Sequence, residues 1–210
     1  FDDAAKPVID EVGELVCTEP MPCMPLYFWD DKGDERYYSS YFDTFPGVWR
    51  HGDWMSVTPR GGVVIYGRSD ATINRHGIRM GTSELYQAIE VLPEVVDSLV
   101  VDLEFLGKQS YMPLFVMLKE GAVLDQNLRE DIKSRIRNAL TARHVPNDIF
   151  TVPAVPRTLS GKKLEVPIKK VLLGQPLEKV VNQDSLANPD SLEWYIDFAE
   201  RFLSKPQGQA

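Results

Sequence analysis

The sequence lacks a long apolar run, since no stretch approaches the about 18 consecutive apolar residues that a membrane-spanning helix needs. It also lacks cysteine beyond Cys17 and Cys23, which have no cluster of further Cys or His around them. A zinc site needs more ligands than this, so we expect free thiols, a reducing compartment such as the cytoplasm, and no metal site. The chain begins at Phe1 without an initiator Met or an apolar signal segment, and we expect it to be a piece of a longer protein.

Basic charge is also scarce. The 210 residues carry 23 Lys and Arg against 31 Asp and Glu, a net charge of -8, which argues against a general nucleic-acid-binding protein. The acidic excess lies toward the two ends, because the net charge is -7 over residues 1–70, +2 over 71–175 and -3 over 176–210. The middle segment is therefore the part best suited to approach an anionic ligand.

What the sequence does have is a mixture of strand and helix patterns with 43% hydrophobic residues, enough for a core. Residues 1–70 are typical of strands and turns. We expect a short apolar strand, an aromatic hairpin or loop around a polar Asp-Asp-Lys-Gly turn, and a strand pair joined by Pro-Arg-Gly-Gly, at residues 13–17, 27–42 and 54–66. Residues 67–70 are predicted to be a linker to the next domain.

Residues 71–175 predict a compact α+β unit. The pattern indicates a short strand pair around Gly77, a helix capped by Thr82 or Ser83, and a long amphipathic helix that begins at Asp125. Further strands are expected at 95–104, 111–119 and 148–158, and a helix over 164–173 that ends before Gly174. The tail, residues 176–210, begins as a loop and contains a helix over 191–203 that packs onto the body.

The stretch WRHGDW (49–54) places Asp53 after a glycine at the start of an apolar strand. A carboxylate held there can accept two hydrogen bonds from a vicinal diol such as that of a ribose. The alternative is an Asp that caps its own backbone in a turn, and taken by itself this stretch favours that alternative.

A second stretch, GRSDATINRHGIRMGTSE (67–84), holds three arginines and two interior glycines within 18 residues. Guanidinium groups suit phosphate or ribose oxygens, and glycine lets another molecule approach the backbone closely. Periodicity alone would make this stretch a β-ribbon with a solvated face.

The third stretch, PRTLSGKK (156–163), is not a phosphate-binding P-loop. That motif needs a glycine where Pro156 stands and a serine or threonine where Lys163 stands. A lysine here can act as a point charge carried on a turn, whereas the alternative is a solvated turn before a surface helix.

The blocks WRHGD (49–53), GRSDATINRHGIRMGTSELYQAIE (67–90) and PRTLSGKK (156–163), in this order, resemble the adenylate-forming superfamily of acyl-CoA synthetases, luciferase-like enzymes and peptide-synthetase adenylation domains. The resemblance covers nearly the whole chain and about the last third of such an enzyme. It implies an α+β fold in which 1–70 end the β-rich subdomain of a large N-terminal adenylation domain. Residues 71–175 would then form a mobile C-terminal lid domain, and 176–210 a C-terminal extension.

The resemblance also implies roles for individual residues. Asp53 matches the aspartate that holds the ribose hydroxyls, and Arg68 and Arg79 match arginines that reach the nucleotide, Arg79 near the phosphates. Asp70 matches the hinge about which the C-terminal domain rotates between two half-reactions. Gly77 lies where the pantetheine of coenzyme A passes close to the backbone.

Lys162 matches the lysine that is essential for adenylation, whereas Lys163 matches a variable position and is expected to be a solvated surface residue. The implied activity is that of an acid–thiol ligase that uses ATP, Mg²⁺ and coenzyme A, and the wording of the blocks favours acetoacetate as the acid. The phosphate loop and acyl pocket belong to the N-terminal domain of the same polypeptide, so we expect this domain as a partner and expect the fragment alone to be inactive.

Two alternatives stay open beside this interpretation. One is a related adenylate-forming enzyme that uses another acid or acceptor, such as a peptide-synthetase domain. The other is a catalytically silent binding module on the same fold, which should have lost Lys162 or Asp53, and both are present. No nucleic acid or membrane is expected as a partner.

Overall fold

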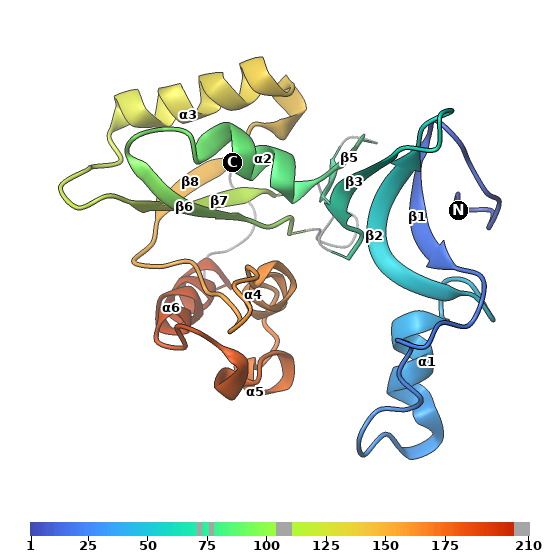
Figure 1. Ribbon diagram of the computed structural model, residues 1–210. Helices are drawn as coiled ribbons and strands as arrows, with labels where there is room; N and C mark the ends of the chain where they lie inside the picture. The colour runs from blue at the N-terminus through green and yellow to red at the C-terminus, as the bar shows by residue number, and fades with distance from the viewer. Residues whose placement is uncertain (71–72, 76–77, 104–110, 204–210) are drawn as a thin grey trace. The chain divides into compact units, whose positions relative to one another are not determined.

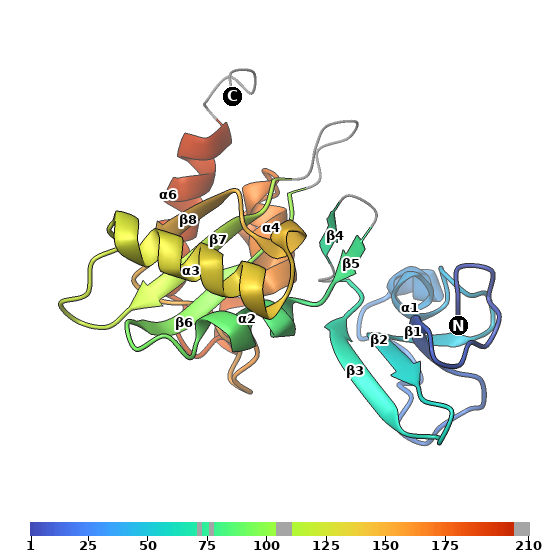
Figure 2. The same ribbon diagram turned by 90° about the horizontal axis from the view of Figure 1, so that it is seen from above.

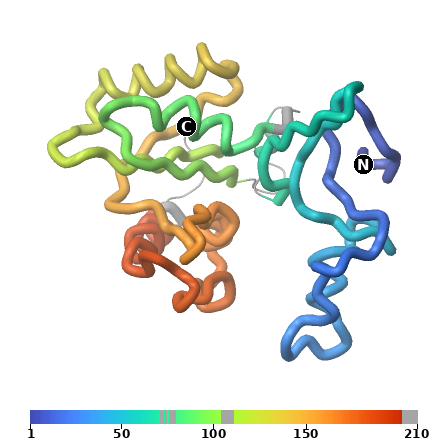
Figure 3. Tube along the Cα trace, viewed as in Figure 1, coloured from blue at the N-terminus to red at the C-terminus, as the bar shows by residue number. Residues whose placement is uncertain are grey.

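The computed structural model describes residues 1–70, 73–75, 78–103 and 111–203. The chain forms two compact units, Phe1–Asp70 and Ala71–Ala210, which we call unit 1 and unit 2. Figures 1 and 3 trace the chain through both units. Each unit has its own sheet and is described by itself.

Unit 1 is built on a three-stranded antiparallel sheet in the order β1-β2-β3. The strands are β1 Val12–Cys17, β2 Trp49–Val57 and β3 Val63–Arg68. The predicted strand pair around the Pro-Arg-Gly-Gly turn is confirmed. The prediction that Gly67 and Arg68 begin a linker is wrong, because they pair with Trp54 and Asp53 as the last residues of β3.

The aromatic segment between β1 and β2 differs from the predicted hairpin or loop. A short 3-10 turn, η1 Lys32–Asp34, leads into the helix α1 Glu35–Tyr41. The Asp31 carboxylate accepts hydrogen bonds from the backbone N–H groups of Arg36 and Tyr37, at 3.0 and 2.8 Å. These are donors that the first turn of a helix leaves unsatisfied, so the polar stretch starts a helix instead of turning a hairpin.

Unit 2 contains the three-stranded sheet β6-β7-β8 and a two-stranded ribbon. In the sheet, β6 Val95–Val100 is antiparallel to β7 Pro113–Leu118, and β8 Asp148–Thr151 is parallel to β7. The ribbon consists of β4 Ile73–Arg75 and β5 Ile78–Met80, which confirms the predicted strand pair in its described part.

Helices cover both faces of the three-stranded sheet (Figures 1 and 2). One face carries α2 Thr82–Ile89 and α3 Gln126–Ala139, and the other carries α4 Glu165–Leu172 and α6 Ser191–Leu203. The alternation of side chains along a strand divides the core accordingly. Leu114 and Val116 of β7 pack in the cluster that includes α2 and α3, whereas Phe115 packs in the cluster that includes α4 and α6.

The helix ends follow the sequence with one exception. Asp125 caps α3 as predicted, since its side chain accepts a hydrogen bond from the backbone N–H of Leu128 at 2.8 Å. Gly174 follows α4 with a φ of +86°, a conformation that favours glycine. The N-cap of α2 is Gly81 and not Thr82 or Ser83, because the extended backbone ends at the glycine and Thr82 is already helical and buried.

The last described segment folds onto unit 2. A 3-10 turn, η2 Ala142–His144, precedes β8, and after α4 come α5 Leu177–Val180, η3 Gln183–Ser185 and α6. Leu192, Tyr195 and Phe198 of α6 are buried in the same cluster as Phe115. The predicted α+β fold with a helical tail is confirmed. Among the described residues, no helix has the length and apolar character required to traverse a bilayer.

Candidate functional site

In unit 1, two of the predicted nucleotide-binding residues lie on neighbouring strands. Asp53 of β2 is directly opposite Arg68 of β3. The register between these strands shifts next to Trp54, and a β-bulge of this kind changes the direction in which nearby side chains point. The fold therefore places the carboxylate and the guanidinium at one irregular end of the sheet.

The Asp53 carboxylate contacts the ring of His51. The His51 Nδ1 lies 2.5 Å from Asp53 Oδ2. An ionised carboxylate can only accept hydrogen bonds, so Nδ1 is the protonated nitrogen of the ring. Each carboxylate oxygen has two lone pairs, and Asp53 therefore keeps acceptor capacity for a diol although His51 already binds it. Asp53 lies within β2 and not in a turn, so its carboxylate is not a turn cap.

Arg68 and the predicted hinge residue Asp70 form a forked ion pair. Arg68 Nε donates to Asp70 Oδ1 at 3.0 Å, and Arg68 Nη2 donates to Asp70 Oδ2 at 2.7 Å. The hydrogen bonds to Asp70 raise the pKa of Arg68 above its ordinary value, against the opposing effect of burial. Two parallel N–H···O bonds fix orientation as well as distance, so Asp70 orients the Arg68 guanidinium.

Gly52, next to Asp53 in the chain, contacts both Glu14 and Arg68. Its backbone N–H donates to Oε1 of the buried Glu14 at 3.0 Å. Its φ is +88°, and a Cβ at this position would lie 2.9 Å from Arg68 Nη2. Glycine is required here for both reasons, since other residues rarely adopt this φ and the guanidinium lies against the backbone.

In unit 2, Lys162 lies on a hydrogen-bonded turn. Arg157 and Lys163 pair across its base as an antiparallel bridge. Thr158 closes the turn, because its N–H donates to Lys162 O at 2.9 Å and its carbonyl accepts from Gly161 N at 2.8 Å. Gly161 has a φ of +84°, which the turn requires. The turn is therefore ordered by its own backbone.

The other edge of this turn pairs with the segment after α5. The N–H of Leu159 donates to Ser185 O, and the N–H of Ala187 donates to Arg157 O, both at 2.9 Å. The Asn188 side chain accepts from the N–H of Arg157 and donates to Val155 O, again at 2.9 Å. The C-terminal segment thus braces the strand-like arm that leads into the turn.

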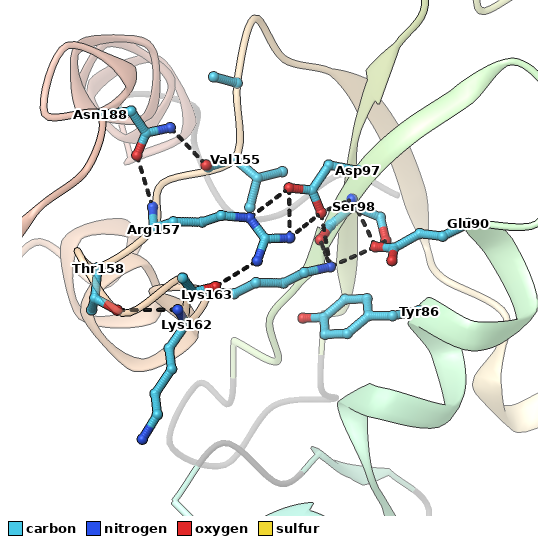
Figure 4. A network of polar contacts seen from close by, with 12 residues as sticks. Tyr86, Glu90, Asp97, Ser98, Val155, Arg157, Thr158, Lys162, Lys163 and Asn188 are labelled. Carbon is cyan, nitrogen blue, oxygen red and sulfur yellow. Dashed lines mark hydrogen bonds and ion pairs between the residues drawn. The ribbon is translucent and has the colours of Figure 1, made fainter.

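Lys163 points inward from the turn into a group of side chains that we call the Lys163 cluster (Figure 4). Its members are Tyr86, Glu90, Asp97, Ser98, Arg157 and Lys163. The Lys163 ammonium lies 2.5 Å from Glu90 Oε1, 3.0 Å from Asp97 Oδ1 and 2.7 Å from Ser98 O. An ammonium has three donors, and each of them has an acceptor here. The side chain is only 13% exposed, so the expectation that Lys163 is a solvated surface residue is wrong.

Arg157 binds the same carboxylate as Lys163. Its Nε and Nη2 donate to the two oxygens of Asp97 at 2.9 and 2.8 Å, and its Nη1 donates to Gly161 O in the turn at 2.6 Å. Burial acts to raise the pKa of Asp97, but the hydrogen bonds and charges of Lys163 and Arg157 outweigh it and hold this pKa below its usual value. Asp97 is therefore ionised and couples β6 to both sides of the turn.

Tyr86 forms the floor of the cluster. Its ring centroid lies 3.6 Å from the Lys163 ammonium, a cation–π contact. Its hydroxyl donates to Glu165 Oε1 at 2.5 Å and accepts from the N–H of Val100 at 3.2 Å. Burial raises the pKa of Tyr86 well above its ordinary value, and the negative charge of Glu165 adds to this effect. Tyr86 thus stays neutral and links α2, β6 and the first turn of α4.

Lys162 points the other way. Its side chain extends from the turn away from the cluster (Figure 4), and the residue is exposed. Its ammonium makes no hydrogen bond or ion pair with any other residue that the structure describes. The two adjacent lysines therefore differ in environment, because one is bound by two carboxylates and the other is presented to solvent.

The remaining predicted site residues cannot be located in the same way. Gly77, the predicted coenzyme A contact, lies outside the described residues, as does the side chain of Arg79. The backbone of Arg79 pairs with Asn74 in the β4–β5 ribbon. Within ranges 1–70, 73–75, 78–103 and 111–203, no group of three His, Cys, Asp or Glu could hold a metal ion.

Sequence reasoning missed several residues that the structure brings into these sites. They are Glu14, His51, Glu90, Asp97 and Arg157. Glu14 and Asp97 did carry a signal, since each is a charged residue within an apolar strand and a buried charge requires a partner. The sequence did not indicate which residue binds Asp97, because its partner Arg157 is 60 residues away in the sequence.

Comparison with known proteins shows what this segment is similar to. Residues 84–162 match the family described as AMP-binding enzyme C-terminal domain. The match includes α2, the sheet and the turn that carries Lys162. Residues 84–162 are therefore similar to the C-terminal domain of AMP-binding enzymes, in agreement with the resemblance of the three sequence blocks to adenylate-forming enzymes.

Proteins similar to nearly the whole chain include acetoacetyl-CoA synthetases. The chain is 44% identical over 196 residues to that of Danio rerio and 42% identical over 200 residues to that of Rhizobium meliloti (strain 1021). These alignments cover 93% and 95% of this chain but only 29% and 30% of the relatives. The solved acetoacetyl-CoA synthetase from Streptomyces lividans is 51% identical, with a TM-score of 0.86 over 96% of this chain and 30% of that one. The chain thus spans about a third of the length of the proteins it matches.

Proposed function

We propose that this chain is the C-terminal portion of an ATP-dependent acid–CoA ligase that converts acetoacetate to acetoacetyl-CoA through an acyl-adenylate. The overall reaction would release AMP and pyrophosphate. The support for the acid is the identity to acetoacetyl-CoA synthetases over 93–95% of the chain. The observation that carries the mechanism is the exposed Lys162, whose charge no described carboxylate neutralises.

Lys162 would act in the first half-reaction. An oxygen of the acid's carboxylate forms a bond to the α-phosphorus of ATP while the bond from that phosphorus to pyrophosphate breaks. Two anions must meet in this step, so a cation held between them stabilises the transition state more than the separated reactants. Loss of one preorganised group of this type costs on the order of 10²–10³ in rate.

Asp53, Arg68 and Arg79 would hold the nucleotide. The carboxylate of Asp53 supplies the acceptors that a ribose diol needs. Arg68 is oriented by its fork to Asp70, and part of its guanidinium lies on Gly52. Arg79 would act near the phosphates, in line with its place in the second sequence block.

Asp70 and Gly77 would serve the second half-reaction. There the thiol of coenzyme A attacks the carbonyl carbon of the acyl-adenylate, AMP leaves, and Lys162 is no longer needed. Rotation of residues 71–175 about Asp70 would exchange the Lys162 turn for the region of Gly77. Asp70 lies at the boundary between the two units, which supports this assignment.

The acid, the adenine ring and the magnesium ion that accompanies ATP would be bound mainly by an N-terminal domain of the same polypeptide. Mg²⁺ would neutralise phosphate charge during adenylation, and the described residues of this chain offer no three-ligand metal cluster for it. The chain alone would therefore be inactive. Because the reaction consumes ATP and coenzyme A, we place it in the cytoplasm.

The test uses the full-length polypeptide that contains this chain. AMP formation should depend on both acetoacetate and coenzyme A, and acetate or butyrate should be much poorer substrates. Lys162→Ala should slow adenylation by on the order of 10²–10³, while thioester formation from a supplied acetoacetyl-adenylate is largely retained. A preference for acetate or butyrate would overturn only the choice of acid, whereas normal adenylation by Lys162→Ala would overturn the role of Lys162.

A further inference from the structure

We propose that Lys163 is a positioning residue that holds the Lys162 turn in its working geometry, an inference that rests on the proposed role of Lys162 in adenylation. Lys163 would not touch the substrates. It would act by fixing the base of the turn to α2 and β6 through the Lys163 cluster. The ammonium of Lys163 would then anchor the turn, and the ammonium of Lys162 would contact the reacting groups.

The first support is the direction of the side chains. Arg157 and Lys163 face each other across the base of the turn, and residues paired in this way project to the same face. Both bind Asp97 on that face. Because neighbouring residues of an extended arm point to opposite faces, anchoring Lys163 inward directs Lys162 outward, as Figure 4 shows.

The second support is the balance of charge. The cluster contains two cations, Arg157 and Lys163, and two carboxylates, Glu90 and Asp97, within hydrogen-bonding distance. Its net charge is zero, and both carboxylates are already bound to cations of the cluster. Glu90 and Asp97 therefore do not need Lys162 as a counter-charge, and the Lys162 ammonium is available for an anionic ligand.

The third support is the way the anchor is attached. Lys163 reaches a carboxylate at the end of α2, a carboxylate in β6 and the backbone carbonyl of Ser98. Helix α2 and strand β6 belong to the packed core, so this attachment is rigid. A merely solvated lysine would leave the turn held by its backbone, by the segment 185–188 and by the Arg157 side chain, without the attachment to Glu90.

The consequence is selective for one half-reaction. Displacement of a catalytic group by about 1 Å can cost about 10²-fold in rate. Loss of the anchor should therefore slow adenylation, which uses Lys162, and should spare thioester formation, which does not. A residue needed only for folding would lower both half-reactions in proportion to the amount of native enzyme.

The experiment uses the full-length polypeptide with three variants. Lys163→Met removes the ammonium and keeps an apolar stem, Glu90→Gln removes one of its carboxylate partners, and Lys170→Met is the matched control at an exposed lysine of α4. Adenylation is measured as acetoacetate-dependent pyrophosphate exchange, and thioester formation is measured from supplied acetoacetyl-adenylate. We expect Lys163→Met to slow adenylation about 10- to 100-fold and thioester formation less than about twofold. Glu90→Gln should show the same selectivity with a smaller loss, and Lys170→Met should show no loss.

A double variant separates this inference from the proposed function. If Lys163 acts through Lys162, the substitution Lys163→Met should have no further effect on pyrophosphate exchange once Lys162→Ala is present. A further tenfold loss in that background, or an equal loss of both half-reactions, would overturn the positioning role. If Lys163→Met does not fold, the half-reaction ratio of Glu90→Gln decides between the same outcomes. Normal exchange by Lys162→Ala alone would instead overturn the proposed function.

Discussion

Two polar clusters differ in how open they are to solvent. We call the group of Glu14, His51, Asp53, Arg68 and Asp70 in unit 1 the open cluster, and the Lys163 cluster in unit 2 the enclosed cluster. In unit 1 the side chains of Arg68 and Asp70 are 51% and 36% exposed, whereas in unit 2 those of Lys163 and Asp97 are 13% and 14% exposed. In the open cluster a ligand can reach the side chains of His51, Arg68 and Asp70 directly, whereas that of Asp53 is 17% exposed. In the enclosed cluster all three donors of Lys163 are bound, and we infer that its effect on a ligand would pass through the neighbouring Lys162. In the proposed reaction, the exposed ion pair and the enclosed one would therefore act in different ways.

Removal of Asp53 should give the largest effect of the open cluster. Asp53→Ala removes a charged acceptor of the ribose hydroxyls, and hydrogen bonds to charged groups contribute about 1.5–3 kcal/mol. We expect the KM for ATP of the full-length enzyme to rise about 10- to 100-fold. The control is Asp43→Ala, an exposed carboxylate of the same unit. Equal KM values for the two variants would exclude Asp53 from the nucleotide site.

Removal of Asp97 should destabilise the enclosed cluster. Asp97→Asn leaves Arg157 and Lys163 without a shared counter-charge, and loss of one partner of a buried ion pair costs on the order of 3 kcal/mol. We expect a lower thermal midpoint of unit 2 in scanning calorimetry. The exposed Asp131→Asn of α3 should leave the midpoint unchanged.

The same residue predicts a pH dependence. The folded-state pKa of Asp97 is below its value in the unfolded chain, about 3.9. Its contribution to stability is therefore fully present above about pH 4 and is lost as the pH falls through the folded-state value. The difference in unfolding free energy between the native chain and Asp97→Asn should be constant from pH 7 to about pH 5 and should shrink below pH 4. A difference that grows on acidification would contradict the ion-pair account.

Gly52→Ala tests the packing of the open cluster. A left-handed conformation in a non-glycine residue costs about 1–3 kcal/mol, and the new Cβ would also crowd Arg68 Nη2 at 2.9 Å. Gly61 is a matched control, because its φ is +80° and nothing lies within 4 Å of its Cβ position. Both variants should lower the stability of unit 1, and only Gly52→Ala should also raise the KM for ATP. Identical behaviour of the two variants would show that Arg68 does not depend on Gly52.

Asn188→Ala should give the smallest effect. It removes two hydrogen bonds that brace the arm of the turn, each with a net contribution of about 1 kcal/mol. Amide hydrogen exchange at residues 157–159 should become faster. Asn182→Ala, which removes only a local hydrogen bond to the N–H of Asp184, should leave that exchange unchanged.

The sequence predicted what depends on local pattern. The strand pair of unit 1, the Asp125-capped helix and the packing of the last helix all follow from periodicity and capping residues, and the structure contains them. The start of α1 was mispredicted because the Asp31 carboxylate satisfies N–H groups five and six residues later, which composition does not reveal.

The candidate site residues also divide into those that a contiguous motif reveals and those that only the packing brings together. Asp53 and Lys162 stand in contiguous motifs and could be selected from the sequence. The anchoring role of Lys163 could not, because its acceptors Glu90 and Asp97 lie far away along the chain and come together only through the packing of α2 and β6. The prediction that Lys163 is solvated is wrong because the tertiary structure encloses its side chain.

One paired measurement distinguishes the proposed role of Lys162 in adenylation from the proposed role of Lys163 as an anchor of the turn. Lys162→Met and Lys163→Met are prepared in the full-length polypeptide, and the rate of acetoacetyl-adenylate formation and the thermal midpoint are measured for both. Lys162→Met should lose on the order of 10²–10³ in rate with an unchanged midpoint, and Lys163→Met should lose less in rate and lower the midpoint. A normal rate for Lys162→Met, or a greater loss for Lys163→Met without any change in midpoint, would contradict the account.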